Sequence, residues 1–399
     1  MKYNLVLPTS VESTSGWVEN SRPVFVIKHE GEEIKPGSVR LNGLLQISKL
    51  VNGVPTVLDP TDLMTIDPDA GVHGFIHQIV TKFGHSTVEN ITEYGKFVKM
   101  KNEAKRYQID NATSTHAMCE LRTYSNDANV STTDVKINAL SGMMFPPDSG
   151  TTGAYELPFS MELEIAVNNA DANIPYSRTE DIEISITLQS NTKTGMTSYK
   201  AVPVAGEVYQ YALKYLELRY SSEMEKSREG AIVLQTKSLA YTPTVQNKSA
   251  SLEYAATSAF DSVVMSFLDV THLQTLNNKN FNYLQTETIT EKLDNLEVKI
   301  NGQNNVLQYP LRFQTAEILY NYLLAFKPYI QNYDSLETMK HGLTYKKLAN
   351  ATQTAGYGLG CAFLDGLDAG TRVQFNLELQ DVPTNPYQAF VYSIGKLII

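Results

Sequence analysis

The sequence predicts an all-β protein built of two eight-stranded antiparallel jelly rolls in tandem, a double jelly roll with a few short helices. Three observations support this fold class. Apolar and polar residues alternate over many short segments, as in strands with one buried face. Glycine turns and long polar loops separate these segments, which is typical of β-sandwiches. The two halves of the chain also repeat one order: a β-rich stretch, a short tyrosine-bearing helix and further strands.

The first half contains the clearest alternation. Ile182, Ile184, Ile186 and Leu188 interleave with polar residues, which indicates a strand with one buried and one wet face. The same criterion predicts strands at residues 24–29, 39–50, 74–82, 118–123, 135–140, 162–167 and 209–220. In the segment 162–167, Glu162 and Glu164 are expected on the solvent side.

The second half follows the same pattern. Val373, Phe375, Leu377 and Leu379 alternate with polar residues. Further strands are predicted at residues 231–239, 259–268, 293–300, 306–313, 358–364 and 388–397. The pairs Asn52-Gly53 and Asn301-Gly302 indicate hairpins, because both central residues of such turns adopt positive φ.

Two short amphipathic helices are predicted at corresponding places of the two halves, residues 91–100 and 318–326. Tyr94 and Tyr320 mark equivalent points of the repeat. A third helix is expected to begin at Ser335 and to stop near Gly342. Each of the first two has one apolar face, made of Ile91, Tyr94, Phe97 and Val98 in the first and of Ile318, Tyr322, Leu323 and Phe326 in the second.

The domain boundary is predicted at a polar, charged stretch that ends in Gly230. We assign the N-terminal jelly roll to residues 1–222, a linker to 223–230 and the C-terminal jelly roll to 231–399. A chain of 399 residues is long enough for two cores, since single cores rarely exceed about 250–300 residues.

Composition excludes several classes of function. The net charge is −10 and no run of Lys or Arg occurs, so direct, sequence-specific binding of nucleic acid is not expected. Two cysteines, Cys119 and Cys361, are too few for a disulfide framework, and we expect free thiols. No signal peptide is recognisable and no apolar stretch reaches membrane-spanning length.

The candidate binding residues do not form a convincing site. His73 and His77 stand four residues apart, with His85 nearby, but a metal site needs a convergent third ligand that the sequence does not supply. Structural histidines are expected instead. The stretches 59–62 and 67–71 resemble fragments of calcium loops, yet their spacing fails, and Asp-Pro pairs are ordinary turn formers.

The candidates for catalysis fail in the same way. The glycines Gly356, Gly358 and Gly360 lack the preceding strand, the following helix and the lysine of a phosphate loop, and we expect a close backbone approach there. No nucleophile elbow is present, and neither cysteine lies in an activating motif. We therefore predict no enzyme, and no catalytic, cofactor-binding or metal-ligating residue.

The closing segments carry a resemblance to a known family. Residues 358–370 (GLGCAFLDGLDAG), 371–379 (TRVQFNLEL) and 387–394 (YQAFVYSI) resemble the last strands of double jelly-roll major capsid proteins. This lineage includes adenovirus hexons, tectiviruses, virophages and polinton-like viruses. The first half has a looser counterpart in residues 66–79 (IDPDAGVHGFIHQI), and residues 157–160 (LPFS) fit the approach to a late strand of the first roll.

The resemblance implies a structural protein of an icosahedral double-stranded DNA virus, found in the virion capsid and assembled inside the host cell. Its chains would form homotrimers that act as pseudo-hexameric capsomers, with the short helices at the flank of each roll. Its partners would be copies of itself, neighbouring capsomers, penton proteins and minor capsid proteins, and an internal membrane is left open. The alternatives are a penton or other minor virion β-protein and a glycan-binding β-sandwich protein.

Overall fold

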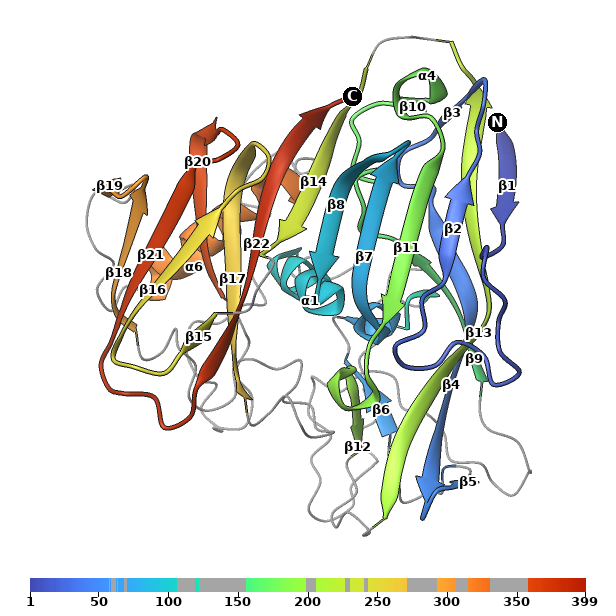
Figure 1. Cartoon of the computed structure of the whole chain (residues 1–399), viewed down its shortest axis with the longest axis horizontal. Coiled ribbons are helices and arrows are strands. Elements are labelled where there is room, and N and C mark those ends of the chain that lie inside the picture. The colour runs from blue at the N-terminus through green and yellow to red at the C-terminus, as the bar shows by residue number, and fades with distance from the viewer. Residues whose placement is uncertain are drawn as a thin grey trace.

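This structure, a computed structural model, describes residues 1–56, 58, 62, 64–67, 70–105, 119–121, 156–198, 206–226, 230–239, 243–270, 293–305, 315–330 and 358–399. Its strands form two β-sandwiches, one from each half of the chain, which lie beside each other (Figure 1).

The first sandwich is an eight-stranded jelly roll. Along β4, alternate residues such as Leu41, Leu45 and Ile47 are buried, as the alternating pattern requires. One sheet has the order β1 (Lys2–Val6), β13 (Glu207–Met224), β4 (Arg40–Val51), β9 (Glu156–Glu162). The other has the order β2 (Val24–Ile27), β11 (Ile182–Leu188), β7 (Ile76–Phe83), β8 (Ser86–Thr92), and all neighbours are antiparallel.

The second sandwich repeats this arrangement strand for strand. Its first, last, third and sixth strands form one sheet, β14 (Ile232–Ser238), β22 (Tyr387–Ile398), β17 (Phe260–Asp269), β20 (Leu359–Leu367). The other sheet is β16 (Ser249–Ala255), β21 (Arg372–Leu379), β18 (Leu293–Ile300), β19 (Gln303–Asn305). The prediction of two eight-stranded jelly rolls in tandem is confirmed.

Short elements complete the described fold. In the first half, β3 (Glu32–Ile34), β5 (Val54–Thr56) and β10 (Ile174–Pro175) extend the sheet of β13 and β4, whereas β6 (Met64–Ile66) pairs with β12 (Met196–Ser198). In the second half, β15 (Thr244–Val245) pairs with β22. The single-turn helices are η1 (Gly71–Phe75), α4 (Tyr176–Thr179), η2 (Asn191–Lys193) and η5 (Lys327–Ile330).

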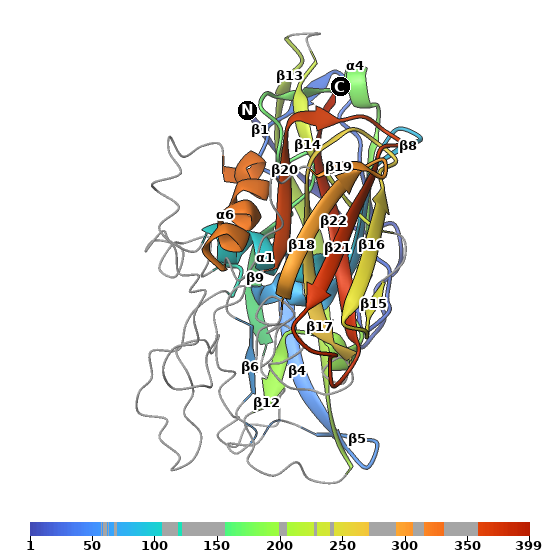
Figure 2. The ribbon, with the colours of Figure 1, turned by 90° about the vertical axis from the view of Figure 1, so that its left-hand side faces the viewer.

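Two longer helices connect the fifth and sixth strands of their rolls. Helix α1 (Tyr94–Lys105) follows β8 and lies between the two rolls (Figure 1), whereas α6 (Thr315–Ala325) packs against β20 and β17 (Figure 2). Gly360 permits this contact, because a Cβ there would lie 2.8 Å from the Cα of Tyr322. The expected close backbone approach at these glycines is therefore confirmed for Gly360. No helix in the described ranges is both long and apolar enough to span a membrane.

The two rolls share one sheet. Strands β8 and β14 pair in parallel through Asn90 and Lys237, so that the order β2-β11-β7-β8-β14-β22-β17-β20 runs through both halves without a break. Strand β13 ends at Met224 and β14 begins at Ile232. The division at residues 223–230 stays a prediction.

Both predicted hairpins are confirmed. Asn52 and Gly53 have φ of 52° and 82° between β4 and β5, and Asn301 and Gly302 have φ of 51° and 73° between β18 and β19. The other predicted strands in the described ranges are present, most with shifted ends, apart from the segments 118–123 and 162–167. The predicted strands 135–140 and 306–313 and the helix at 335–342 lie outside the described residues.

Four expectations are wrong. Residues 119–121 of the predicted strand 118–123 form the end of a helix, which Leu121 closes with a φ of 56°. In 162–167 the strand ends at Glu162, and Leu163, Ile165 and Val167 are buried within an irregular turn. Helix α1 begins at Tyr94 rather than at residue 91, because β8 continues to Thr92.

The fourth error concerns the repeated tyrosines. Tyr94 is fully buried, but Tyr320 is 52% exposed, so the two positions are not equivalent. Tyr322 is the buried tyrosine of α6, and its ring lies 5.3 Å from that of Phe326. The repeat of the halves is real in strand order, and the helices within it differ in register.

Candidate functional site at the junction of the two rolls

Helix α1 belongs to the first roll by sequence but packs against side chains of the second. The ring of Phe97 lies 6.2 Å from Phe326, 5.8 Å from Tyr329 and 5.2 Å from Tyr392, and all four side chains are buried. Aromatic pairs at such distances contribute about 0.5–1.5 kcal/mol each beyond the burial of their area. Phe97 therefore connects the two rolls.

Both sides of α1 are buried. Its predicted apolar face is confirmed, since Tyr94, Phe97 and Val98 are inaccessible to solvent. Lys96 and Lys101 on the helix are also buried, at 1% exposure each. Their ammonium groups lie over the rings of Phe390 and Tyr329, at 5.0 and 5.7 Å from the centroids. Such contacts compensate part of the cost of removing a cation from water.

Glu93 makes the corner between β8 and α1, with a φ of 53°. Its carboxylate pairs with Lys96, lies 3.3 Å from His77 Nδ1 and accepts a hydrogen bond of 3.1 Å from Gln189. Burial by itself would raise the pKa of Glu93, but Lys96 and His77 outweigh it and hold the pKa at about 2. The backbone carbonyl of Glu93 accepts a hydrogen bond of 3.1 Å from the hydroxyl of Tyr392 in the second roll.

Glu89 on β8 bridges the two rolls through backbone groups. Its carboxyl oxygens accept hydrogen bonds from the N–H of Ala166 at 2.6 Å and of Thr236 at 3.0 Å, the first in the first roll and the second on β14. Burial raises the pKa of Glu89 to about 8, although these two N–H donors and Lys237 lower it. At neutral pH the Glu89 side chain is therefore mostly protonated.

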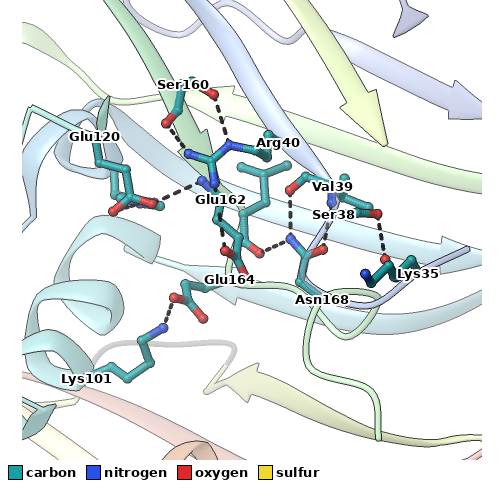
Figure 3. Close-up of polar contacts among 12 residues, drawn as sticks. Lys35, Ser38, Val39, Arg40, Lys101, Glu120, Ser160, Glu162, Glu164 and Asn168 are labelled. Atoms are coloured by element: carbon teal, nitrogen blue, oxygen red, sulfur yellow. Dashed lines mark hydrogen bonds and ion pairs between the residues drawn. The ribbon is translucent and has the colours of Figure 1, made fainter. Parts of the chain in front are cut away.

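A second polar cluster fixes the turn that follows β9 (Figure 3). The hydroxyl of Tyr94 accepts the N–H of Glu164 at 2.8 Å and lies 3.2 Å from His73 Nδ1. Lys101 forms an ion pair with Glu164. Asn168 accepts the N–H of Val39 at 2.9 Å and donates to the carbonyls of Val39 and Leu163, at 2.7 Å each. This turn includes Ala166, whose backbone N–H donates a hydrogen bond to Glu89.

The junction is thus a set of contacts that hold two rolls in one relative orientation. Its residues come from β8, α1, the turn after β9, β14, η5 and β22. The carboxyl group of Glu89 accepts backbone N–H groups, whereas the carboxylates of Glu93 and Glu164 are engaged by the side chains of Lys96 and Lys101. These contacts therefore serve to orient the two rolls relative to each other.

The histidines of the predicted metal candidate are separated by the fold. His73 is buried in η1, between Tyr94 and Glu120, whose carboxylate lies 3.7 Å away. His77, which lies on β7, contacts Glu93, and His85 is exposed in the turn after β7. Across the described ranges, no three potential ligands come together in a metal-binding group.

The acidic candidates have structural roles. Asp62 pairs with Lys49 at 2.8 Å and accepts a hydrogen bond of 2.9 Å from Tyr209. Asp67 accepts the N–H of Ala70 at 2.8 Å, as a turn former does. Asp59 and Asp69 lie outside the described residues.

The remaining candidates are two glutamates and the cysteines. The solvent side expected for Glu162 and Glu164 is confirmed in part: their side chains are 29% and 19% exposed, while Glu162 lies 3.9 Å from Arg40 and Glu164 pairs with Lys101. Cys361 is buried, which raises the pKa of its thiol to about 12, and Cys119 is half-buried. Both cysteines are free thiols.

Comparison with known proteins identifies solved structures of similar fold. No protein-family model and no curated protein matches the sequence. Solved structures match it over its full length. The major capsid protein of Faustovirus matches with a TM-score of 0.61 at 10% identity, over 100% of this chain and 90% of that one. The fold is the double jelly roll.

Two further structures agree. The mavirus major capsid protein matches with a TM-score of 0.57 at 11% identity, over 100% of this chain and 90% of that one. A chain in the structure of the Sputnik virophage matches with a TM-score of 0.55 at 10% identity, over 100% of this chain and 86% of that one. The resemblance predicted from the closing strands is confirmed at the level of the fold, which is similar to that of these viral capsid proteins.

Replacing Phe97 with Ala should lower the free energy of unfolding by about 3–5 kcal/mol, because it removes the ring that packs into the second roll and leaves a cavity. Urea unfolding measures this loss. The exposed Val382→Ala variant is the control and should change stability by less than about 0.5 kcal/mol. A loss below about 1 kcal/mol for Phe97→Ala would show that the rolls do not depend on α1.

Glu89 should make stability depend on pH. Its pKa is raised in the folded state, so its contribution is complete below about pH 4.5 and is lost as the pH rises through about 8. The Glu89→Gln variant cannot titrate, so its free energy of unfolding should fall less between pH 5 and 9 than that of the native chain. Urea titrations at several pH values measure the difference, and the exposed Glu378→Gln variant controls for the loss of one carboxylate. Equal pH slopes for native and Glu89→Gln protein would contradict this assignment.

Proposed function

We propose that this chain is the major capsid protein of an icosahedral double-stranded DNA virus and that three copies form a pseudo-hexameric capsomer. The observation that carries the proposal is the repeat: eight strands in the same sheet order occur twice in one chain. The full-length likeness to the major capsid proteins of Faustovirus and mavirus supports it.

The mechanism is geometric. Two similar rolls held side by side present two similar wedges, and three chains around a three-fold axis present six. A three-fold object can then occupy a hexagonal position in a closed shell, with each interface set by symmetry. The junction of Glu89, Glu93 and Phe97 serves this function by keeping the two wedges of a chain in one orientation.

The protein is proposed to act in the virion capsid and to assemble inside the host cell. Its partners are further copies of itself in the trimer, neighbouring capsomers, penton proteins and minor capsid proteins, with an internal membrane left open. It is proposed to have no enzymatic activity, no cofactor and no direct sequence-specific contact with nucleic acid. The net charge of −10 agrees with the last point.

The repeat also weighs against the main alternative. A penton or minor virion protein with one roll and an unrelated β-domain would not superpose on itself, whereas the two halves of this chain share their strand order. No feature of the described residues favours a glycan-binding protein.

The purified chain should be a stable trimer in solution at micromolar concentration, with three times the 44.4 kDa mass of the chain. Large obligate interfaces, above about 2,000 Å², persist at such concentrations. Light scattering coupled to size exclusion measures the mass. A monomer that persists at every micromolar concentration would contradict the capsomer proposal.

A further inference from the structure

Strand β1 exposes apolar side chains on one face. Tyr3, Leu5 and Leu7 are 80%, 51% and 63% exposed, and Tyr3 and Leu5 alternate with residues that face the other way. Among the latter, Val6 packs against the core. Among the described residues β1 pairs with β13 alone, so its other edge is open. An open apolar edge strand favours pairing with another chain.

The exposed face points away from the interior of the first roll. Leu5 pairs with Arg219 on β13, and paired residues of an antiparallel ladder share a face. Arg219 is exposed, whereas Leu218, the partner of Val6, is fully buried. We call Tyr3, Leu5, Leu7 and Arg219 the β1 face.

The second roll contains an equivalent of β1 whose edge is covered. Strand β14 is likewise the first strand of its roll and pairs with the last strand, β22. Its edge is occupied by the first roll: β8 pairs with it at Lys237, Glu89 holds the N–H of Thr236, and the N–H of Leu234 donates to the carbonyl of Asn169 at 2.9 Å.

The outer face of this equivalent pair is also covered. Ser393 of β22 faces the interior, where it contacts Tyr254 of the opposite sheet, so Tyr392 beside it points outward. Helix α1 covers Tyr392 with Phe97, and Lys96 covers Phe390. The helix between the fifth and sixth strands of one roll therefore covers the last strand of the next.

Among the described residues, only the second roll receives this cover from within the chain. We infer that the β1 face binds a second copy of this chain, whose α6 and η5 cover it as α1 covers β22. Helix α6 is the counterpart of α1 between the fifth and sixth strands, and Tyr320 on it is 52% exposed. The inference rests on the proposed trimer, in which such a head-to-tail contact closes into a ring.

The test uses the full chain and the variant Leu5→Glu, which places a charge in the β1 face. The matched control is Val54→Glu on β5, since Val54 is 63% exposed and belongs to the same sheet. Light scattering over a dilution series should show trimers for native and control protein and at least about 10-fold weaker association for Leu5→Glu. Circular dichroism should show the same β-content for all three.

A crosslinking experiment identifies the contacting segment, even if Leu5→Glu fails to fold. A photoreactive benzoylphenylalanine replaces Tyr3, and isotopically labelled and unlabelled chains are mixed. Mass spectrometry should find crosslinks from residue 3 to residues 315–330 of a second copy, and the same probe at Val54 should not give them. Crosslinks from residue 3 only to other segments would overturn the assignment of α6 and η5.

The outcomes separate the two proposals. A native monomer at all concentrations overturns the trimer. A native trimer that Leu5→Glu leaves unchanged, or that Val54→Glu weakens equally, overturns the role of the β1 face while the proposed function stands.

Discussion

The packing of α1 between the two rolls is the contact on which the rest of the structure depends. Phe97 lies within 6.2 Å of three aromatic rings of the second roll, so a helix of the first half covers the outer face of a sheet of the second. The parallel pair of β8 and β14 then joins one sheet of each roll. Two sandwiches that could have been separate domains are thereby fixed as a pair. A pair of fixed orientation is what a pseudo-hexameric capsomer needs from its chain.

The polar groups at the junction fix the relative orientation of the two rolls and have no assigned catalytic role. Glu89 holds one backbone N–H from each roll, and the carbonyl of Glu93 receives Tyr392 across the junction. Their pKa values move apart, to about 8 and about 2, because burial dominates at Glu89 over the backbone donors, Thr81 and Lys237, whereas Glu93 has Lys96 and His77 beside it. Perturbed carboxyl groups often indicate an active site, but buried structural networks perturb them as well. Here the Glu89 carboxyl accepts backbone N–H groups of both rolls, and the backbone carbonyl of Glu93 accepts the Tyr392 hydroxyl.

The strands and the tandem fold could be predicted because alternation records burial locally. Ile182 to Leu188 has this pattern, and the structure makes it β11. The junction could not be predicted, since Glu89, Lys96 and Lys101 read as solvent-exposed residues unless their partners, distant in sequence, are known. The turn after β9 misled for the same reason: Leu163, Ile165 and Val167 are buried between the rolls rather than on a strand. The apolar face of the second helix could be predicted, since Tyr322, Leu323 and Phe326 are buried, whereas matching the tyrosines of the two halves chose Tyr320, which is exposed.

The central claim is that two fixed rolls per chain let three chains imitate six. Electron microscopy of the purified protein, with three-dimensional reconstruction to a resolution that separates β-sheets, tests it most directly. The account predicts particles of three-fold symmetry with a near-hexagonal outline and six sandwiches around the axis, alternating between first and second rolls. Particles with one sandwich pair, or with the two rolls of a chain in variable relative orientation, would contradict it.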